Sequence, residues 1–178
     1  MSKTKPCTAL LLVLAVAACS GKPQGTPTGA ELLQPFKAQL KEALQAGVAE
    51  GPVSAIDVCA VKAPQIAASL STNGVRMGRT SHKLRNPANV APAWAREILE
   101  TYLEEPEQRK PVTVALGNSL MGHVEPIVAQ PMCLVCHGGT IAPDIAQAID
   151  TAYPDDRAKG FEAGDLRGIF WVEYPEIR

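Results

Sequence analysis

The N-terminal half of the chain repeats its apolar residues at the spacing of amphipathic helices. A first helix is predicted over residues 33–48, where an apolar residue recurs at every fourth position: Phe36, Leu40, Leu44 and Val48. Gly51 and Pro52 then act as a stop signal. A second helix is predicted over residues 53–70, with one apolar face formed by Ile56, Cys59, Ala60, Ala63 and Ile66. We expect Pro64 to kink or divide this second helix, because proline has no amide hydrogen to donate.

The second half of the chain is predicted to be mostly β-structure. Residues 91–105 form a third helix with an apolar stripe of Trp94, Ile98 and Tyr102, and residues 144–152 form a short fourth one. Four segments have the composition of strands, namely 74–81, 111–118, 120–129 and 166–174. Helices followed by strands that connect through short turns predict an α+β domain, with the helices packed on one antiparallel sheet.

The first twenty residues have the pattern of a bacterial lipoprotein signal. Lys3 and Lys5 precede an apolar run over residues 9–18, which is too short to span a bilayer. The run ends in Val-Ala-Ala-Cys, so that cleavage before Cys19 would leave this cysteine as the lipid-bearing first residue. A membrane anchor that stays in place is the alternative. Residues 19–30 are rich in Gly, Pro, Ser and Thr and are predicted to form a flexible tether, which leaves residues 31–178 as the folded domain.

These features predict a location in the bacterial cell envelope, lipid-anchored and facing the periplasm. Ser20 after the lipidated cysteine favours the outer membrane in a Gram-negative cell. Loss of residues 1–18 would remove two of the 17 basic side chains and none of the 18 acidic ones, for a net charge of −3. No run of basic residues is present, so nucleic acid is not an expected partner. Apart from the lipid anchor in the membrane, the expected partner is an unidentified protein of the envelope.

The segment PMCLVCHGGT, residues 131–140, carries the main chemical signal. Two cysteines three positions apart, with a histidine directly after the second, form the attachment motif for c-type haem. Cys133 and Cys136 would each bond to a vinyl group of the macrocycle, and His137 would be an axial ligand of the iron. The periplasm is an oxidising compartment in which this attachment takes place. We therefore expect one covalently bound haem c.

The same cysteine spacing also occurs in zinc sites and in dithiol redox centres. A zinc site requires two further ligands at a comparable spacing, and the sequence has no second cysteine pair of this kind. A dithiol centre is expected at the start of a helix after a strand in a βαβ unit, which this order of elements does not contain. Haem attachment is therefore the favoured interpretation.

A second axial ligand would have to come from upstream of the motif. Cys59 lies on the inward face of its helix and has no cysteine left with which to pair, although it could be a buried structural residue. His123, on the strand that leads to the motif, is the alternative. The remaining candidates are expected to serve other roles, either in the core or in a polar loop: His82, Met77, Met121 and Met132.

A group of cationic side chains lies in and beside the loop of residues 82–92. Arg79, Lys83 and Arg85 could pair with the propionate groups of a haem, or they could belong to a solvated loop. The sequence leaves both interpretations open.

Four segments in this order resemble a family of single-haem c-type domains that was long catalogued as a domain of unknown function. They are AIDVCAVKAP, RTSHKLRNPAN, CLVCHG and YPDDRAKGFEAGDLRG, and the resemblance covers roughly residues 31–175. The resemblance implies a PAS-like fold, with His137 and Cys59 as the two axial ligands. His123 departs from the family pattern, in which an aromatic or arginine-like residue is expected, so it stays the alternative ligand.

Two functions follow from a haem with two protein ligands. A thiolate ligand favours ferric iron and a low reduction potential, and a closed coordination sphere disfavours catalysis. An electron-transfer role is favoured, because a lipid-anchored carrier can move between envelope partners. The alternative is a redox or gas sensor, in which Cys59 leaves the iron upon reduction or upon binding of CO or NO. The PAS-like fold is compatible with sensing, but a fold alone does not define a function.

Overall fold

The computed structural model describes residues 27–176. The expected signal peptide, Cys19 and most of the expected tether lie outside this range. The first helix, α1 (Gly29–Glu50), begins four residues before the predicted start, so the last two residues assigned to the tether are helical. Thr28 and Glu31 form a capping box, in which each side chain accepts a hydrogen bond from the backbone amide of the other residue. This Thr-x-x-Glu pattern is a helix-start signal. It was overlooked because the Gly, Pro, Ser and Thr residues around it led to the assignment of residues 19–30 as a tether.

The predicted apolar stripe of α1 faces the core only in the first part of the helix. Phe36 and Leu40 are buried, whereas Val48 is 44% exposed. A spacing of four residues overshoots one helical turn by roughly 40°, so the fourth member of the series no longer faces inward. Gly47 lies on the buried face instead, where an added Cβ would lie 2.8 Å from the side chain of Val58.

The second helical segment is continuous but changes its winding before Pro64. It consists of α2 (Pro52–Asp57), a π-helical turn η1 (Val58–Lys62) and α3 (Ala63–Leu70). The amide of Ala63 donates to the carbonyl of Val58, five residues back, so the turn widens where proline cannot donate. By length and composition alone the run Pro52–Leu70 is apolar enough to cross a membrane. In this fold, however, its Ala63 and Ile66 pack against the core.

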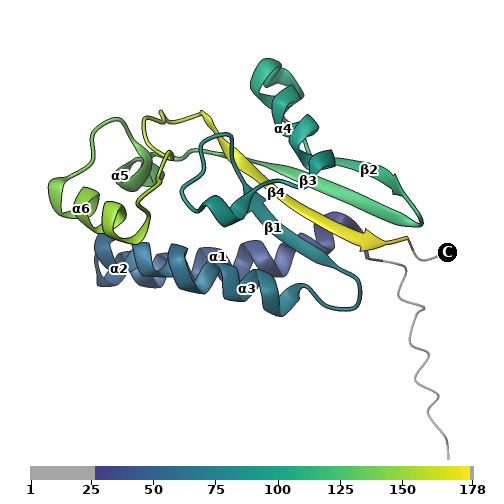
Figure 1. Cartoon of the computed structure of the whole chain (residues 1–178), viewed down its shortest axis with the longest axis horizontal. Coiled ribbons are helices and arrows are strands. Elements are labelled where there is room, and N and C mark those ends of the chain that lie inside the picture. The colour runs from purple at the N-terminus through teal and green to yellow at the C-terminus, as the bar shows by residue number, and fades with distance from the viewer. Residues whose placement is uncertain (1–26, 177–178) are drawn as a thin grey trace, which may run out of the picture.

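The sheet has four antiparallel strands in the order β1-β4-β3-β2. The strands are β1 (Arg76–Thr80), β2 (Val112–Gly117), β3 (Leu120–Val128) and β4 (Leu166–Pro175). β2 and β3 form a hairpin whose turn residues, Asn118 and Ser119, both have positive φ. β4 therefore lies between β1 and the hairpin and pairs with both β1 and β3. Its first residues lie close to the haem-type motif (Figure 1).

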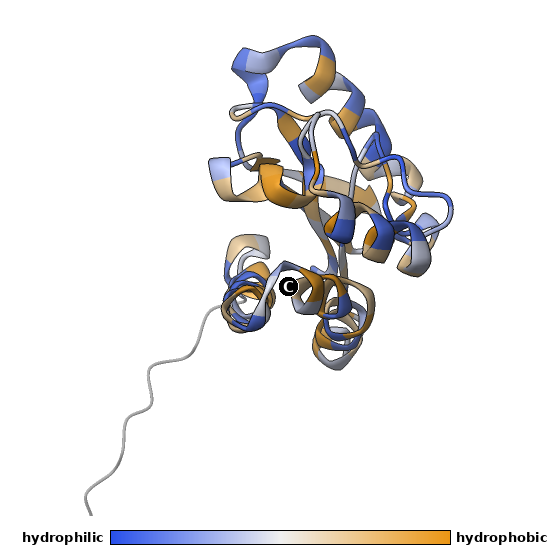
Figure 2. Ribbon diagram, turned by 90° about the vertical axis from the view of Figure 1, so that its left-hand side faces the viewer, coloured by the Kyte–Doolittle hydropathy of each residue, from blue (hydrophilic) through white to orange (hydrophobic). Residues whose placement is uncertain are grey.

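Helices cover both faces of the sheet. α1 and α3 pack on one face through a core that contains Leu33, Phe36, Met77 and Val172. α4 (Ala93–Glu104) packs on the opposite face, around Leu99. Figure 2 shows that the helices seen end-on carry both apolar and polar stretches, as expected for elements with one face in the core.

A third cluster lies beyond the end of the sheet. There α2 packs against α6 (Pro143–Ala152) through Ile56, Ile145, Ile149 and Tyr153. The motif helix α5 (Leu134–His137) adjoins this cluster (Figure 1), and short 3-10 turns, η2 (Pro87–Asn89), η3 (Pro106–Gln108) and η4 (Pro131–Cys133), complete the chain. The α+β class, with helices around an antiparallel sheet in a PAS-like arrangement, is thus confirmed.

We predict that Gly168→Ala strongly destabilises the fold. At this glycine β4 approaches β1 so closely that an added Cβ would lie 2.0 Å from the carbonyl oxygen of Thr80. The backbone of β4 at residue 168 or that of β1 at Thr80 must move to relieve this clash. We expect a loss of about 2–3 kcal/mol in the free energy of unfolding. Urea unfolding measures this loss. Gly139→Ala is the control, because an added Cβ there meets nothing within 4 Å; equal effects of the two changes would contradict the prediction.

Candidate functional site

The two motif cysteines lie on one short helical turn that leaves the sheet. After β3 the chain is held to the start of β4, since the amide of Ala129 donates to the carbonyl of Asp165 over 2.8 Å. It then passes through η4 into the four-residue α5, which ends at His137 with Gly138 as its C-cap. Cys133 and Cys136 are half-buried free thiols. Cys136 packs against the cluster formed by α2 and α6, so the motif is fixed on both sides.

His137 is held in one orientation by the backbone. Its Nδ1 lies 2.7 Å from the carbonyl oxygen of Ala158, which can only accept, so Nδ1 carries the proton. The other ring nitrogen, Nε2, is then unprotonated and able to bind a metal. Burial, together with the nearby guanidinium groups of Arg167 and Arg85, lowers the pKa of His137 to about 3. The imidazole is therefore neutral at physiological pH.

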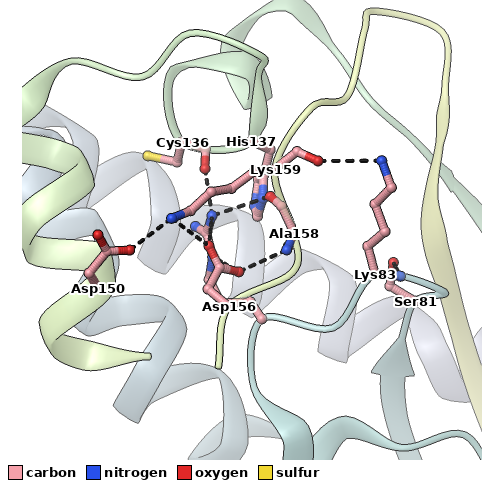
Figure 3. Close-up of polar contacts among 9 residues, drawn as sticks. Ser81, Lys83, Cys136, His137, Asp150, Asp156, Ala158 and Lys159 are labelled. Carbon is pink, nitrogen blue, oxygen red and sulfur yellow. Dashed lines mark hydrogen bonds and ion pairs between the residues drawn. The ribbon is translucent and has the colours of Figure 1, made fainter. Parts of the chain in front are cut away.

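A buried ion pair fixes the carbonyl on which His137 depends. Arg85 donates from Nε to Asp156 Oδ1 over 3.1 Å and from Nη2 to Asp156 Oδ2 over 3.2 Å. The same Nη2 also donates to the carbonyl oxygens of Cys136, over 2.5 Å, and Ala158, over 3.3 Å. Asp156 in turn accepts the amide of Ala158 over 2.8 Å. Figure 3 shows this network around His137.

The three cationic candidates, Arg79, Lys83 and Arg85, have different environments in the structure. Arg85 uses its donors on Asp156 and on backbone carbonyls, so it is a structural partner of the motif rather than a free cation. Lys83 lies over the ring of Phe161, with its Nζ 4.9 Å from the ring centroid, and donates to the carbonyl of Lys159. Arg79, on β1, makes no salt bridge with another residue of the described range 27–176.

Cys59 lies in the π-helical turn and faces the same region as the motif. Its neighbours Ile56 and Ala60 belong to the cluster that contacts Cys136. Burial raises the pKa of Tyr153 to about 12, and a negative charge on Cys59 adds to this shift. The structure therefore brings Cys59, which follows α1, and Cys136, near the end of the chain, to one site.

His123, the alternative ligand, lies elsewhere. An added Cβ on Gly29, in the first turn of α1, would lie 2.2 Å from the Cβ of His123. The turn that carries Cys59 instead packs near Gly47, through Val58. The helical rise between Gly29 and Gly47 is roughly 27 Å. His123 binds Thr113 Oγ1 through Nδ1 over 2.7 Å, and its ring belongs to the core under α1 rather than to the motif.

The other candidates also have ordinary structural roles. Met77 is buried in the core between the sheet and α1, with Met121 packed beside it, and Met132 is 56% exposed. His82 is exposed, and its ring packs edge-on against Phe161 with a centroid separation of 5.7 Å. That none of the four binds a metal stays a prediction.

The rival uses of the motif receive little support from its surroundings. Burial raises the pKa of Cys136, whereas a reactive dithiol requires a lowered thiol pKa. Within residues 27–176, no group of three or more His, Cys, Asp or Glu side chains is arranged to hold a metal ion. A zinc site built from protein ligands alone would require such a group.

Comparison with known proteins agrees with this architecture. A family model described as Tll0287-like matches residues 15–175. The chain belongs to the Tll0287-like family. Among solved structures, the crystal structure of the cyanobacterial heme-protein Tll0287 matches with a TM-score of 0.64 and 23% sequence identity, over 84% of this chain and 93% of that one. No curated protein matches. The Tll0287-like fold is thus shown for nearly the whole described chain.

Several site residues of this Tll0287-like chain escaped the sequence interpretation. Asp156, Phe161 and Arg167 lie in the segment YPDDRAKGFEAGDLRG, which carries the family resemblance but gives none of the three a role. Asp156 is 71 residues from Arg85 in the sequence, so no local spacing indicates that they pair. The pair of adjacent acids in that segment was a further signal, but it does not identify which of them is buried.

We predict that Asp156→Asn destabilises the protein by about 3 kcal/mol or more, because it leaves the guanidinium of Arg85 buried without a counter-charge. The side chains of Arg85 and Asp156 are only 8% and 1% exposed. Asp150→Asn is the matched control. Its ion pair with Lys159 is exposed, and we expect a loss of less than about 1 kcal/mol. Urea unfolding of both variants tests this, and similar losses would contradict it.

We also predict that His123 makes the protein less stable in mild acid. Burial lowers the pKa of His123, only partly offset by Glu125, and Lys37 lowers it further. Below pH 6.5, roughly the pKa in the unfolded state, the unfolded chain binds a proton that the folded chain does not, so stability falls as the pH falls. His123→Gln removes this difference and should flatten the loss of unfolding free energy between pH 7.5 and 5.5. Parallel pH profiles for variant and parent would refute it.

Proposed function

We propose that this protein is a c-type haem protein that transfers electrons in the bacterial cell envelope. The observation that carries the proposal is the arrangement of His137, whose Nδ1 is fixed on the carbonyl of Ala158. This leaves Nε2 without a proton and able to bind a metal, within a turn that also carries two free thiols. This is the donor set that covalent haem attachment requires.

The residues of the site fit the chemistry of a single haem c. Cys133 and Cys136 would form the two thioether bonds, and His137 would bind the iron. Cys59 would be the second protein ligand, since its helix packs on the cluster that contains Cys136. The cyanobacterial relative of the same fold is described as a heme-protein, which supports the same cofactor here.

When bound, the haem supplies an iron that gains and loses one electron. A thiolate from Cys59 would donate charge to the iron and favour the ferric state. Two protein ligands leave no open position for a substrate, which supports a carrier rather than an enzyme. The buried pair of Arg85 and Asp156 would keep His137 in the same place in both oxidation states. A ligand that does not move is what rapid electron transfer requires.

The location and partners follow from the N-terminal segment. We propose that residues 1–18 are a signal peptide and that Cys19 carries lipid, which would hold the protein at the periplasmic face of a membrane, with the outer membrane favoured. The segment after Cys19 would then tether the domain, up to the start of α1 at Gly29. The redox partner would be another protein of the envelope.

A haem-based redox or gas sensor is the second candidate function, and one observation favours it. Cys59 lies in a π-helical turn, an element that is uncommon and often found at functional sites. A turn of this kind can return to α-helical winding, which would withdraw Cys59 from the iron. The vacated position could then accept CO or NO.

The prediction that tests the function uses the mature protein, produced with haem-maturation machinery. We expect covalently bound haem, and a low-spin ferric electron paramagnetic resonance spectrum with thiolate character that is lost in Cys59→Ser. His123→Gln is the matched control and should leave the spectrum unchanged. Protein without covalent haem would refute the proposed cofactor. A thiolate signature that survives Cys59→Ser would refute the ligand assignment.

The response of the ferrous protein to CO distinguishes electron transfer from sensing. If it keeps its spectrum under CO, both ligands stay on the iron and electron transfer is supported. If it forms a CO complex while Cys59 is present, the thiolate has been displaced and the sensor is favoured. Absorption spectra of the dithionite-reduced protein measure this difference.

A further inference from the structure

Arg167 is a half-buried arginine that lies near His137, the proposed iron ligand. Its guanidinium carbon is 5.1 Å from the centroid of the Phe161 ring. The ring of His137 packs perpendicular to the same Phe161 ring, with centroids 6.3 Å apart. Phe161 is held there by its amide, which donates to the carbonyl of His137 over 2.9 Å. Arg167 therefore belongs to the site through geometry that the sequence interpretation did not anticipate.

No carboxylate of the described chain neutralises Arg167 or Arg79. Within residues 27–176, neither side chain takes part in a salt bridge. The buried acid of this region, Asp156, is already paired with Arg85. Burial, followed by the charges of Arg79 and Arg85, lowers the pKa of Arg167 to about 10, and Cys59 and Asp156 offset this lowering only in part. Such an arrangement is costly unless an anion joins it.

Arg79 lies beside an open space. It forms part of the wall of a cavity of about 270 Å³ between α3, β1 and the loop that contains η2. Asn86 and Asn89 line the same cavity, together with the small residues Ala63 and Ala67 of α3. The cavity thus offers room for an anionic group next to a guanidinium.

The charges of a bound haem match those of the two arginines. A ferric iron, the dianionic macrocycle and one thiolate are together neutral, which leaves only the two propionate carboxylates. Arg79 and Arg167 supply two positive charges, and neither has a carboxylate partner within residues 27–176. Guanidinium groups bind carboxylates through paired hydrogen bonds, which makes arginine well suited to this role.

We propose that Arg79 and Arg167 bind the propionate groups of the haem, which extends the proposed function and rests on it. Arg167 and Arg79 enter the site from adjacent strands, β4 and β1. Arg85 is a weaker candidate because it is paired with Asp156, and Lys83 already donates to the carbonyl of Lys159. The arginines thus set the orientation of the macrocycle and the electrostatic potential at the iron.

The test compares the holoprotein with Arg167→Gln, Arg79→Gln and Arg167→Lys. Resonance Raman spectroscopy reports the bending modes of the propionates, which respond to the hydrogen bonds that they accept. Redox titration reports the midpoint potential. Arg76→Gln is the matched control, because Arg76 lies on the same strand as Arg79 but is 69% exposed in a surface pair with Glu173.

We expect each glutamine variant to shift the propionate modes and to lower the potential, since loss of a positive charge favours ferric iron. Arg167→Lys should keep most of the potential and still shift the modes. Arg76→Gln should change neither. Should Arg167→Gln not fold, Arg79→Gln and Arg167→Lys give the same readouts.

Two results would overturn the assignment. Unchanged propionate modes in the variants would show that other groups bind the propionates. A change confined to the thiolate bands would assign Arg167 to Cys59 instead. Both results presuppose covalent haem in the parent protein, so they are distinct from a failure of the proposed function, in which the parent carries no haem.

Discussion

The candidate site depends on the buried ion pair between Arg85 and Asp156. Each partner is almost fully removed from solvent, and each also binds backbone groups of the motif region. A pair of this kind contributes little net stability compared with apolar residues, but removal of one partner is costly. Its importance lies in position, because it ties the loop after β1 to the loop after α6 and fixes the carbonyl of Ala158. The orientation of His137 follows from that carbonyl.

The surrounding elements bring the remaining site residues to the same place. The π-helical turn widens the helix just before Pro64 and carries Cys59. The close approach of β4 to β1 at Gly168 brings the start of β4, with Arg167, next to the end of β1. Phe161 then contacts both Arg167 and His137. Features that look unrelated in the sequence, a proline, a glycine and a phenylalanine, thus serve one arrangement.

The charge distribution links this arrangement to the proposed cofactor. The protein pairs one arginine of the site with its own carboxylate and leaves Arg79 and Arg167 without one in the described chain. The imidazole of His137 is neutral, as an iron ligand must be. The positive charge of the nearby arginines would balance the two carboxylates of a haem. This view treats the arginines as part of the cofactor site, although the sequence pattern placed only one of these two among the candidates.

The sequence by itself determined the features that depend on residues close together in the chain. The Cys-x-x-Cys-His spacing, the helix periodicity of residues 33–48 and the order of helices and strands are all local. Local spacing indicates them, because one turn or one strand decides which side chains share a face, although the helix periodicity misplaced Val48, which is exposed. The capping box at Thr28 was equally local, and the start of α1 could have been predicted from it.

Only the tertiary structure decided which distant residues meet. Arg85 pairs with Asp156 across 71 residues, and Cys59 approaches Cys136 because α2 packs on α6. His123 precedes the motif closely in sequence, yet the extended strand β3 and the length of α1 place it at the far end of the core. Long-range pairing depends on the path of the whole backbone, and a single sequence does not contain that path in any local pattern.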